Sequence, residues 1–112
     1  MNILYCDKDL ELFNEFEKMY GSSNNLYFLE NIKDAIVVLI QKKIDVLIIE
    51  LNFPIDACYY LVNYSKKNYP NLKIAIVSAY SDEMVLEIIA SDLAVKNFFK
   101  KPIDENMLQR IL

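Results

Sequence analysis

Four polar side chains stand at the ends of short apolar segments, where they could form one site. Asp7 follows the first segment, Glu50 closes the third, Ser78 closes the fourth and Lys101 follows the fifth. If these segments are parallel strands, their carboxyl ends meet at one edge of a sheet, which is where ligands bind in open α/β sheets. Two carboxylates, a hydroxyl and an amine suit a divalent cation, a phosphoryl group or an internal network of ion pairs.

The pattern of hydrophobic residues predicts the strands that position these side chains. Short apolar runs rich in β-branched and aromatic residues alternate with longer stretches of helical periodicity, which is typical of βαβ units. The third and fourth runs are the most continuously apolar, as strands covered by helices on both faces should be. The expected strands are Asn2–Cys6, Leu26–Leu29, Asp45–Glu50, Lys73–Ser78 and Lys96–Phe99. The sequence therefore predicts an α/β fold with a parallel sheet.

Five helices are expected between and after these strands. Asp9, Asn31 and Ser81 are placed to cap the first, second and fourth helices, and Gly21 to end the first. The last helix is expected to begin near Asp104 and to be barely two turns long, which is compatible with the sequence being the N-terminal part of a longer protein. The side chains expected to face the core are Leu10, Phe13, Phe16 and Tyr20, then Leu61 and Val62, then Val85, Ile88 and Ile89.

Composition limits the class of protein. A chain of 112 residues that is 54% hydrophobic is long enough for one domain with one core, so we expect a single domain over residues 1–112. A net charge of −4 argues against direct nucleic-acid contact, which depends on clustered Lys and Arg. Because no apolar run approaches the roughly 20 residues of a membrane span, we expect a cytoplasmic protein without membrane contact. The absence of histidine excludes Ser-His-Asp and Cys-His catalysis.

The chain resembles the receiver domains of two-component response regulators, and the resemblance spans essentially its whole length. The matching segments are ILYCDKD at 3–9, DVLIIELNFP at 45–54, IVSA at 76–79 and FFKKP at 98–102. Each segment is weak evidence by itself, but four in the right order and spacing are specific. The resemblance implies a flavodoxin-like, CheY-like fold, with a doubly wound five-stranded parallel sheet in the order 2-1-3-4-5 and helices on both faces.

The resemblance also implies roles for the residues at the carboxyl edge. The implied metal ligands are Asp7 and Glu50, and the Lys101-Pro102 peptide matches a position that is commonly cis in the family. From the residues themselves, Lys101 is expected to be an ion-pair partner of the carboxylates rather than a catalyst. The implied roles are acidic pair for Cys6 and Asp7, phosphoacceptor position for Glu50, phosphoryl contact for Ser78 and Lys101, and switch aromatic for Phe98.

Three departures from the family pattern separate this chain from a conventional receiver. Cys6 stands in place of the first acidic residue, and because Mg²⁺ prefers oxygen ligands we expect the metal to bind weakly or not at all. Glu50 is one methylene longer than aspartate, about 1.5 Å, whereas reaction geometry tolerates displacements of about 1 Å poorly. Ala57 and Cys58 replace a typical Asp/Asn-Gly pair, so the loop path is expected to be altered. Cys6 and Cys58 have no CxxC spacing, and Cys6 is expected to be an inert core thiol.

Three functions from different classes were weighed against this pattern. We favour a phosphorylation-independent signalling module that is not an enzyme, in which Glu50 either mimics the phosphorylated state or only pairs with Lys101. The alternative is a conventional Mg²⁺-dependent, phospho-accepting receiver that controls a DNA-binding or other output domain. A flavodoxin-like cofactor binder would need a glycine-rich phosphate loop, but Gly21 is the only glycine. No cofactor beyond weak Mg²⁺ is expected.

The expected partners follow from the favoured function. We expect a protein partner or an output domain, with no direct contact to nucleic acid by this domain. The resemblance suggests a homodimer formed through the fourth helix, the fifth strand and the fifth helix, and the short fifth helix leaves this open. The sequence does not identify the output.

Overall fold

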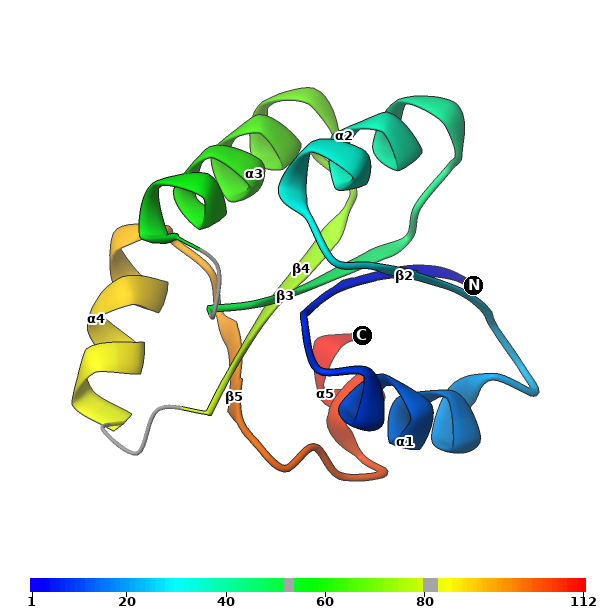
Figure 1. Cartoon of the computed structure of the whole chain (residues 1–112). Coiled ribbons are helices and arrows are strands. Elements are labelled where there is room, and N and C mark those ends of the chain that lie inside the picture. The colour runs from blue at the N-terminus through cyan, green and yellow to red at the C-terminus, as the bar shows by residue number, and fades with distance from the viewer. Residues whose placement is uncertain (52–53, 80–82) are drawn as a thin grey trace.

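The computed structural model, which describes residues 1–51, 54–79 and 83–112, confirms the expected sheet (Figure 1). Over these residues five parallel strands lie in the order β2-β1-β3-β4-β5. The predicted bounds are correct to within one residue. The small differences arise because backbone pairing, and not hydrophobicity, ends each strand: Asn25 pairs with Asn2, and Lys100 with Ser78. The strands are β1 Asn2–Cys6, β2 Asn25–Leu29, β3 Val46–Glu50, β4 Lys73–Ser78 and β5 Asn97–Lys100.

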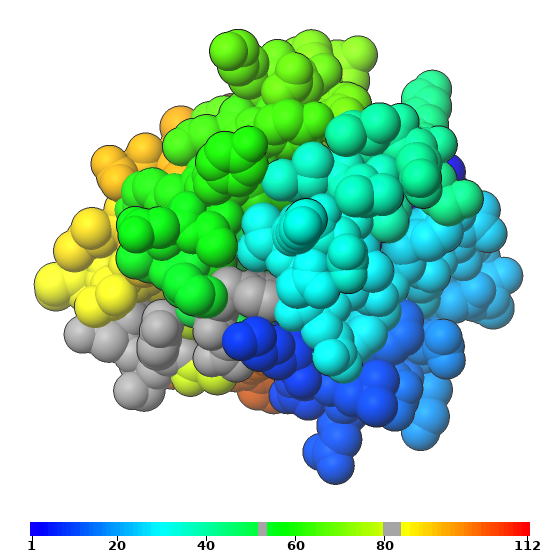
Figure 2. Space-filling model, turned by 45° about the horizontal axis from the view of Figure 1, so that its top comes forward, coloured from blue at the N-terminus to red at the C-terminus, as the bar shows by residue number. Residues whose placement is uncertain are grey.

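Helices cover both faces of the sheet, as expected. Helices α2, α3 and α4 pack on one face, and α1 and α5 on the other. Figure 2 shows α2 and α3 side by side on the outside of their face. Within the described residues, no helix is both long and apolar enough to cross a membrane. The helices are α1 Leu10–Tyr20, α2 Ile32–Gln41, α3 Ile55–Asn68, α4 Glu83–Asp92 and α5 Met107–Ile111.

Alternation along the strands divides the core into two clusters. In β1, Leu4 and Cys6 belong to the cluster under α2, α3 and α4, whereas Ile3 and Tyr5 belong to the cluster under α1 and α5. This follows because successive side chains of a strand point to opposite faces of the sheet. The central strand β3 is buried along its whole length, including Glu50 at its end. A carboxylate in that position needs a partner at the edge of the sheet.

Two of the predicted helix caps are confirmed. The Asp9 side chain accepts a hydrogen bond from the backbone N–H of Leu12 at 3.1 Å, and Asn31 accepts one from Asp34 at 2.8 Å. Gly21 follows α1 as expected, but it keeps a right-handed backbone with φ of −68°. Its position therefore does not depend on the left-handed freedom of glycine. The third predicted cap, Ser81, lies outside the described residues.

Three of the side chains expected to face the core are exposed instead. Leu10 is 55% exposed, Val85 41% and Ile88 61%, so these predictions were wrong. Leu10 is the first residue of α1, where the helix has not yet turned toward the sheet. In α4 the apolar residues surround most of the helix, so periodicity did not define one inward face. The inward residues of α4 and of the turn after it are Leu86, Ala90 and Leu93.

Two other boundaries differ from expectation. Ala57 and Cys58 do not form a loop but lie in the first turn of α3, where both backbone N–H groups donate to the carbonyl of Pro54. The preceding residues 52–53 of that connection are not among those described. Helix α5 begins at Met107 rather than near Asp104, because the Asp104 side chain accepts from the N–H of Asn106 at 2.8 Å and forms a turn first.

The cap of α2 gives a test of the local structure. Asn31→Ala removes the acceptor for the Asp34 N–H, and we expect it to lower the free energy of unfolding by about 1 kcal/mol. The measurement is urea unfolding followed by circular dichroism. Lys33→Ala, an exposed change in the same helix, is the control and should stay within about 0.5 kcal/mol of the original chain. Equal stability of the two variants would contradict the capping role.

Candidate functional site

Three carboxylates surround the amine of Lys101 at the carboxyl edge of the sheet. Its Nζ atom lies 3.0 Å from Asp7 Oδ2, 3.8 Å from Glu50 Oε1 and 3.9 Å from Asp9 Oδ2. The side chains of Asp7 and Glu50 are 0% and 1% exposed, and that of Lys101 is 11% exposed. The expected ion pair between Lys101 and the two buried carboxylates is therefore present. Asp9, predicted only as a helix cap, also reaches the amine.

Backbone pairing beyond the strand ends positions these groups. Asp7 comes directly after β1, and its N–H donates to the carbonyl of Leu29 at 3.1 Å. Glu50 is the last residue of β3. Lys101 comes directly after β5, and its N–H donates to the carbonyl of Ser78 at 2.8 Å. Sheet pairing thus continues up to the site and fixes the backbone positions from which these side chains extend.

Asp7 is held by two hydrogen bonds and one ion pair. Its Oδ2 atom accepts from the phenol of Tyr5 at 3.1 Å and pairs with the amine of Lys101, and its Oδ1 atom accepts from the N–H of Asp9 at 2.9 Å. Burial, and after it the charge of Asp7, raises the pKa of Tyr5 far above its ordinary value, so the phenol stays a donor. Sequence reasoning missed Tyr5. The available signal was a tyrosine two residues before an aspartate, on the same face of a buried strand.

The structure places Ser78 near the cluster and Phe98 apart from it. Ser78 is fully buried at the end of β4, where its carbonyl holds the backbone of Lys101. Phe98 lies on the exposed side of the edge strand β5 and is 36% exposed. The Lys101-Pro102 peptide is cis, as the resemblance implies. The roles of these residues toward a phosphoryl group stay predictions.

Cys6 points away from the carboxylates and into the apolar cluster under α3. It is fully buried together with Cys58, whose Sγ donates to the backbone carbonyl of Glu50 at 3.8 Å. Burial first, then Cys58 and Asp7, raises the pKa of the Cys6 thiol from its ordinary 9.0 to about 12. Because the thiolate is the reactive form, this supports the expected inert thiol.

The residues at the edge do not fit the Mg²⁺ site that the resemblance implies. Asp7 and Glu50 are the implied ligands, yet Oδ2 of Asp7 already accepts a hydrogen bond from Tyr5 and forms an ion pair with Lys101, whose amine also lies 3.8 Å from Glu50. Cys6 offers only a buried sulfur. Among the described residues, no group of three or more His, Cys, Asp or Glu side chains could hold a metal ion. The arrangement is that of a satisfied ion-pair network.

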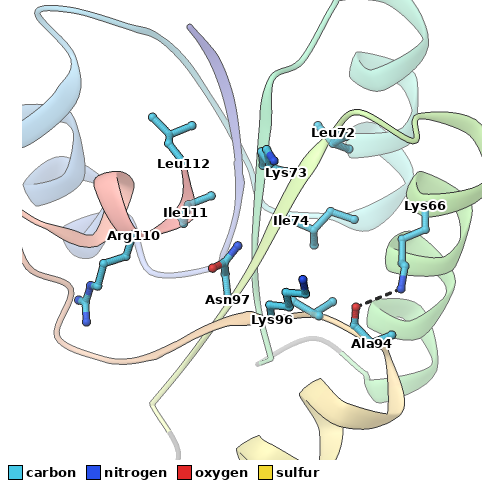
Figure 3. Close-up of a pocket in the computed structure, with 11 residues that line it drawn as sticks. Lys66, Leu72, Lys73, Ile74, Ala94, Lys96, Asn97, Arg110, Ile111 and Leu112 are labelled. Carbon is cyan, nitrogen blue, oxygen red and sulfur yellow. Dashed lines mark hydrogen bonds between the residues drawn. The ribbon is translucent and has the colours of Figure 1, made fainter.

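A pocket lies at the opposite, amino edge of the sheet, between α3, β4, β5 and α5 (Figure 3). Its volume is about 350 Å³. The Lys66 amine donates to the carbonyls of Leu93 and Ala94 at 2.9 and 3.1 Å, and Arg110 pairs with Asp104 at 2.8 Å. These two cations therefore hold the chain's own backbone and side chains in place. The cationic residues that line the pocket are Lys66, Lys73, Lys96 and Arg110.

Comparison with known proteins identifies the fold. No family model and no curated protein matches the sequence. The structure is similar to a response regulator from Thermotoga maritima, with 19% identity, a TM-score of 0.83 and coverage of 98% of this chain and 95% of that one. It is also similar to HP1043, an orphan response regulator of H. pylori, with 17% identity, a TM-score of 0.81 and coverage of 99% and 92%.

A longer protein contains the same fold as one part. RcsB from Salmonella enterica serovar Typhimurium, solved bound to promoter rprA in the presence of the phosphomimetic BeF₃⁻, has 21% identity and a TM-score of 0.76. The match covers 99% of this chain but 65% of that chain. At these identities the comparisons establish the fold, which is the CheY-like receiver fold.

Removing the amine of Lys101 tests the ion-pair network. Lys101→Met leaves Asp7 and Glu50 buried without their cation, so we expect the free energy of unfolding at pH 7 to fall by about 3 kcal/mol. Urea unfolding measures it. Lys96→Met is the control, since Lys96 is an exposed lysine directly before β5 and its loss should cost under about 0.5 kcal/mol. A loss of the same size in both variants would show that the network adds nothing to stability.

The thiol of Cys6 gives a pH-dependent test. A pKa of 9.0 in the unfolded chain and about 12 in the folded chain means that the folded state holds this proton more tightly. The stabilisation is complete below pH 9 and is lost as pH rises from 9 toward 12, at up to about 1.4 kcal/mol per pH unit. We expect Cys6→Val to flatten the fall of unfolding free energy above pH 9. Parallel curves for the two proteins would contradict the assigned burial of the thiol.

Proposed function

We propose that this chain is a receiver domain of two-component signalling that acts as a phosphorylation-independent regulatory module and not as an enzyme. The observation that carries the proposal is the state of Glu50. This carboxylate stands at the end of β3, is 1% exposed and lies 3.8 Å from the amine of Lys101. A negative charge is thus present and paired at the position that the resemblance assigns to the phosphoacceptor.

The chemistry of phosphoryl transfer supports this choice. Such transfer depends on holding the acceptor oxygen in line with the donor and on neutralising charge as it develops. The longer side chain of Glu50 disturbs the first requirement. The cation requirement is also poorly met, because Asp7 already accepts from Tyr5 and pairs with Lys101, and Cys6 is buried in the apolar cluster. Both defects act on the same transition state, so correcting one alone should recover little activity.

A module of this kind acts through contacts with other proteins. Several large apolar side chains on α4 and β5 are exposed, among them Met84 at 69%, Ile88 at 61% and Phe98 at 36%. Exposed apolar groups of this kind suit an interface with a protein partner, an output domain or a second copy of the chain. RcsB, whose fold is similar over part of its length, was solved bound to a promoter. We propose a cytoplasmic protein whose receiver domain does not itself touch nucleic acid.

Labelling with acetyl phosphate and Mg²⁺ tests the proposal. The original chain, Glu50→Asp and the double variant Cys6→Asp/Glu50→Asp are incubated with the donor, and intact mass reports any added phosphoryl group. We expect appreciable labelling only in the double variant, because it alone restores both the acceptor geometry and an oxygen ligand for the metal.

The double variant further changed by Asp7→Asn serves as the matched control, and it should lose the label. Stoichiometric labelling of the original chain would instead support a conventional phospho-accepting receiver with a partner kinase. A double variant that is folded by circular dichroism but unlabelled would show that Cys6 and Glu50 are not the groups that block transfer.

A further inference from the structure

The two groups that contact Oδ2 of Asp7 differ in kind, since one is charged and the other is neutral. Lys101 supplies an ammonium at 3.0 Å as an ion pair, and Tyr5 supplies a phenol that donates a hydrogen bond at 3.1 Å. The phenol uses one lone pair of Oδ2, and the ammonium lies against the same oxygen. The other oxygen, Oδ1, is turned toward the start of α1 by the N–H of Asp9. A divalent cation reaching Oδ2 would have to displace either the amine or the phenol.

The phenol of Tyr5 is held in place by the packing of its ring. Tyr5 is 0% exposed, and the surrounding aromatic side chains come from both α1 and β2. Because the ring is fixed on several sides, its hydroxyl is aimed at Asp7 without further loss of side-chain freedom. The neighbouring ring centroids lie at 6.3 Å for Phe13, 5.2 Å for Phe16 and 6.1 Å for Phe28.

The amine of Lys101 is a cation that already lies among these carboxylates. It lies within 3.0 to 3.9 Å of carboxylate oxygens from Asp7, Asp9 and Glu50. Tyr5 fixes the nearest of these carboxylates, and with it the position of the amine. The aromatic cluster therefore fixes Tyr5, Tyr5 fixes the carboxylate of Asp7, and Asp7 in turn fixes the amine of Lys101.

We propose that Tyr5 is a positioning residue that reserves Asp7 for the ammonium of Lys101 and thereby keeps divalent cations out of the site. This inference deepens the proposed function and rests on the same site, but it adds a cause that the replacement of an acidic residue by Cys6 does not supply. An oxygen ligand introduced at position 6 would still meet an Asp7 whose Oδ2 is occupied. Metal exclusion thus has two independent sources in this chain.

Mn²⁺ binding to Tyr5→Phe tests the proposal. The substitution keeps the ring and its packing but removes the donor, which frees one lone pair of Oδ2. Paramagnetic broadening of backbone amide signals measures both affinity and location. We expect Mn²⁺ to bind about tenfold more tightly than in the original chain, as the loss of one hydrogen bond to a charged group implies. The broadening should centre on Asp7, Glu50 and Lys101.

Tyr20→Phe is the matched control. The Tyr20 phenol lies in the same apolar cluster, donates to the carbonyl of Asp104 at 3.0 Å and accepts from the N–H of Leu108 at 3.4 Å, so its removal also deletes a hydroxyl together with its hydrogen bonds. We expect no change in Mn²⁺ affinity for this variant. A purely structural role for Tyr5 would lower stability in both variants without changing metal binding in either.

A second pair of variants makes the test independent of the weak affinity of the original chain for Mn²⁺. Cys6→Asp should bind Mn²⁺ more tightly than the original chain, and Cys6→Asp/Tyr5→Phe should bind about tenfold more tightly again. Equal affinities with and without the phenol in both backgrounds would overturn the role of Tyr5. That result would leave the proposed function untouched, since acetyl phosphate labelling of the original chain judges it separately.

Discussion

The ion pair between Lys101 and Asp7 is the interaction on which the carboxyl edge of the sheet depends. Two carboxylates that are at most 1% exposed are stabilised there by an amine that lies 3.0 Å from one and 3.8 Å from the other. The three partners follow or end different strands, β1, β3 and β5. A shift of β5 by one residue would turn Lys101 to the other face of the sheet. The register of β5 therefore determines whether the two carboxylates have a cation, and the ion pairs in turn favour this register.

Alternation along β1 explains why two adjacent residues, Cys6 and Asp7, have opposite surroundings. Tyr5 and Asp7 share one side, where two hydrogen-bond donors and the amine of Lys101 give the aspartate a polar setting. Cys6 points to the other side, where an apolar cluster raises its pKa to about 12. The substitution by cysteine is thus consistent with the packing under α3.

The sequence predicted the strands, whose hydrophobic pattern is periodic, but missed site residues whose role depends on the direction of one side chain. The pairing of Lys101 followed from strand ends, since parallel strands share one edge, whereas the strand order was implied by the resemblance to receiver domains. Tyr5 and Asp9 were missed as site residues because hydrophobic patterns do not show where a phenol or a loop carboxylate points. The predicted inward face of α4 was wrong because its apolar residues lie on several sides, so only packing into the apolar cluster buries Leu86.

The two hydrogen bonds of the Lys66 amine connect α3 to the end of α4. The Lys66 amine, carried by α3, holds the carbonyls of Leu93 and Ala94 just beyond the end of α4. Ala94 has a left-handed backbone with φ of 54°, a conformation that this grip helps to retain. Helix α4 is therefore tied to α3 at its C-terminal end, and a partner that displaces this end has to break both hydrogen bonds.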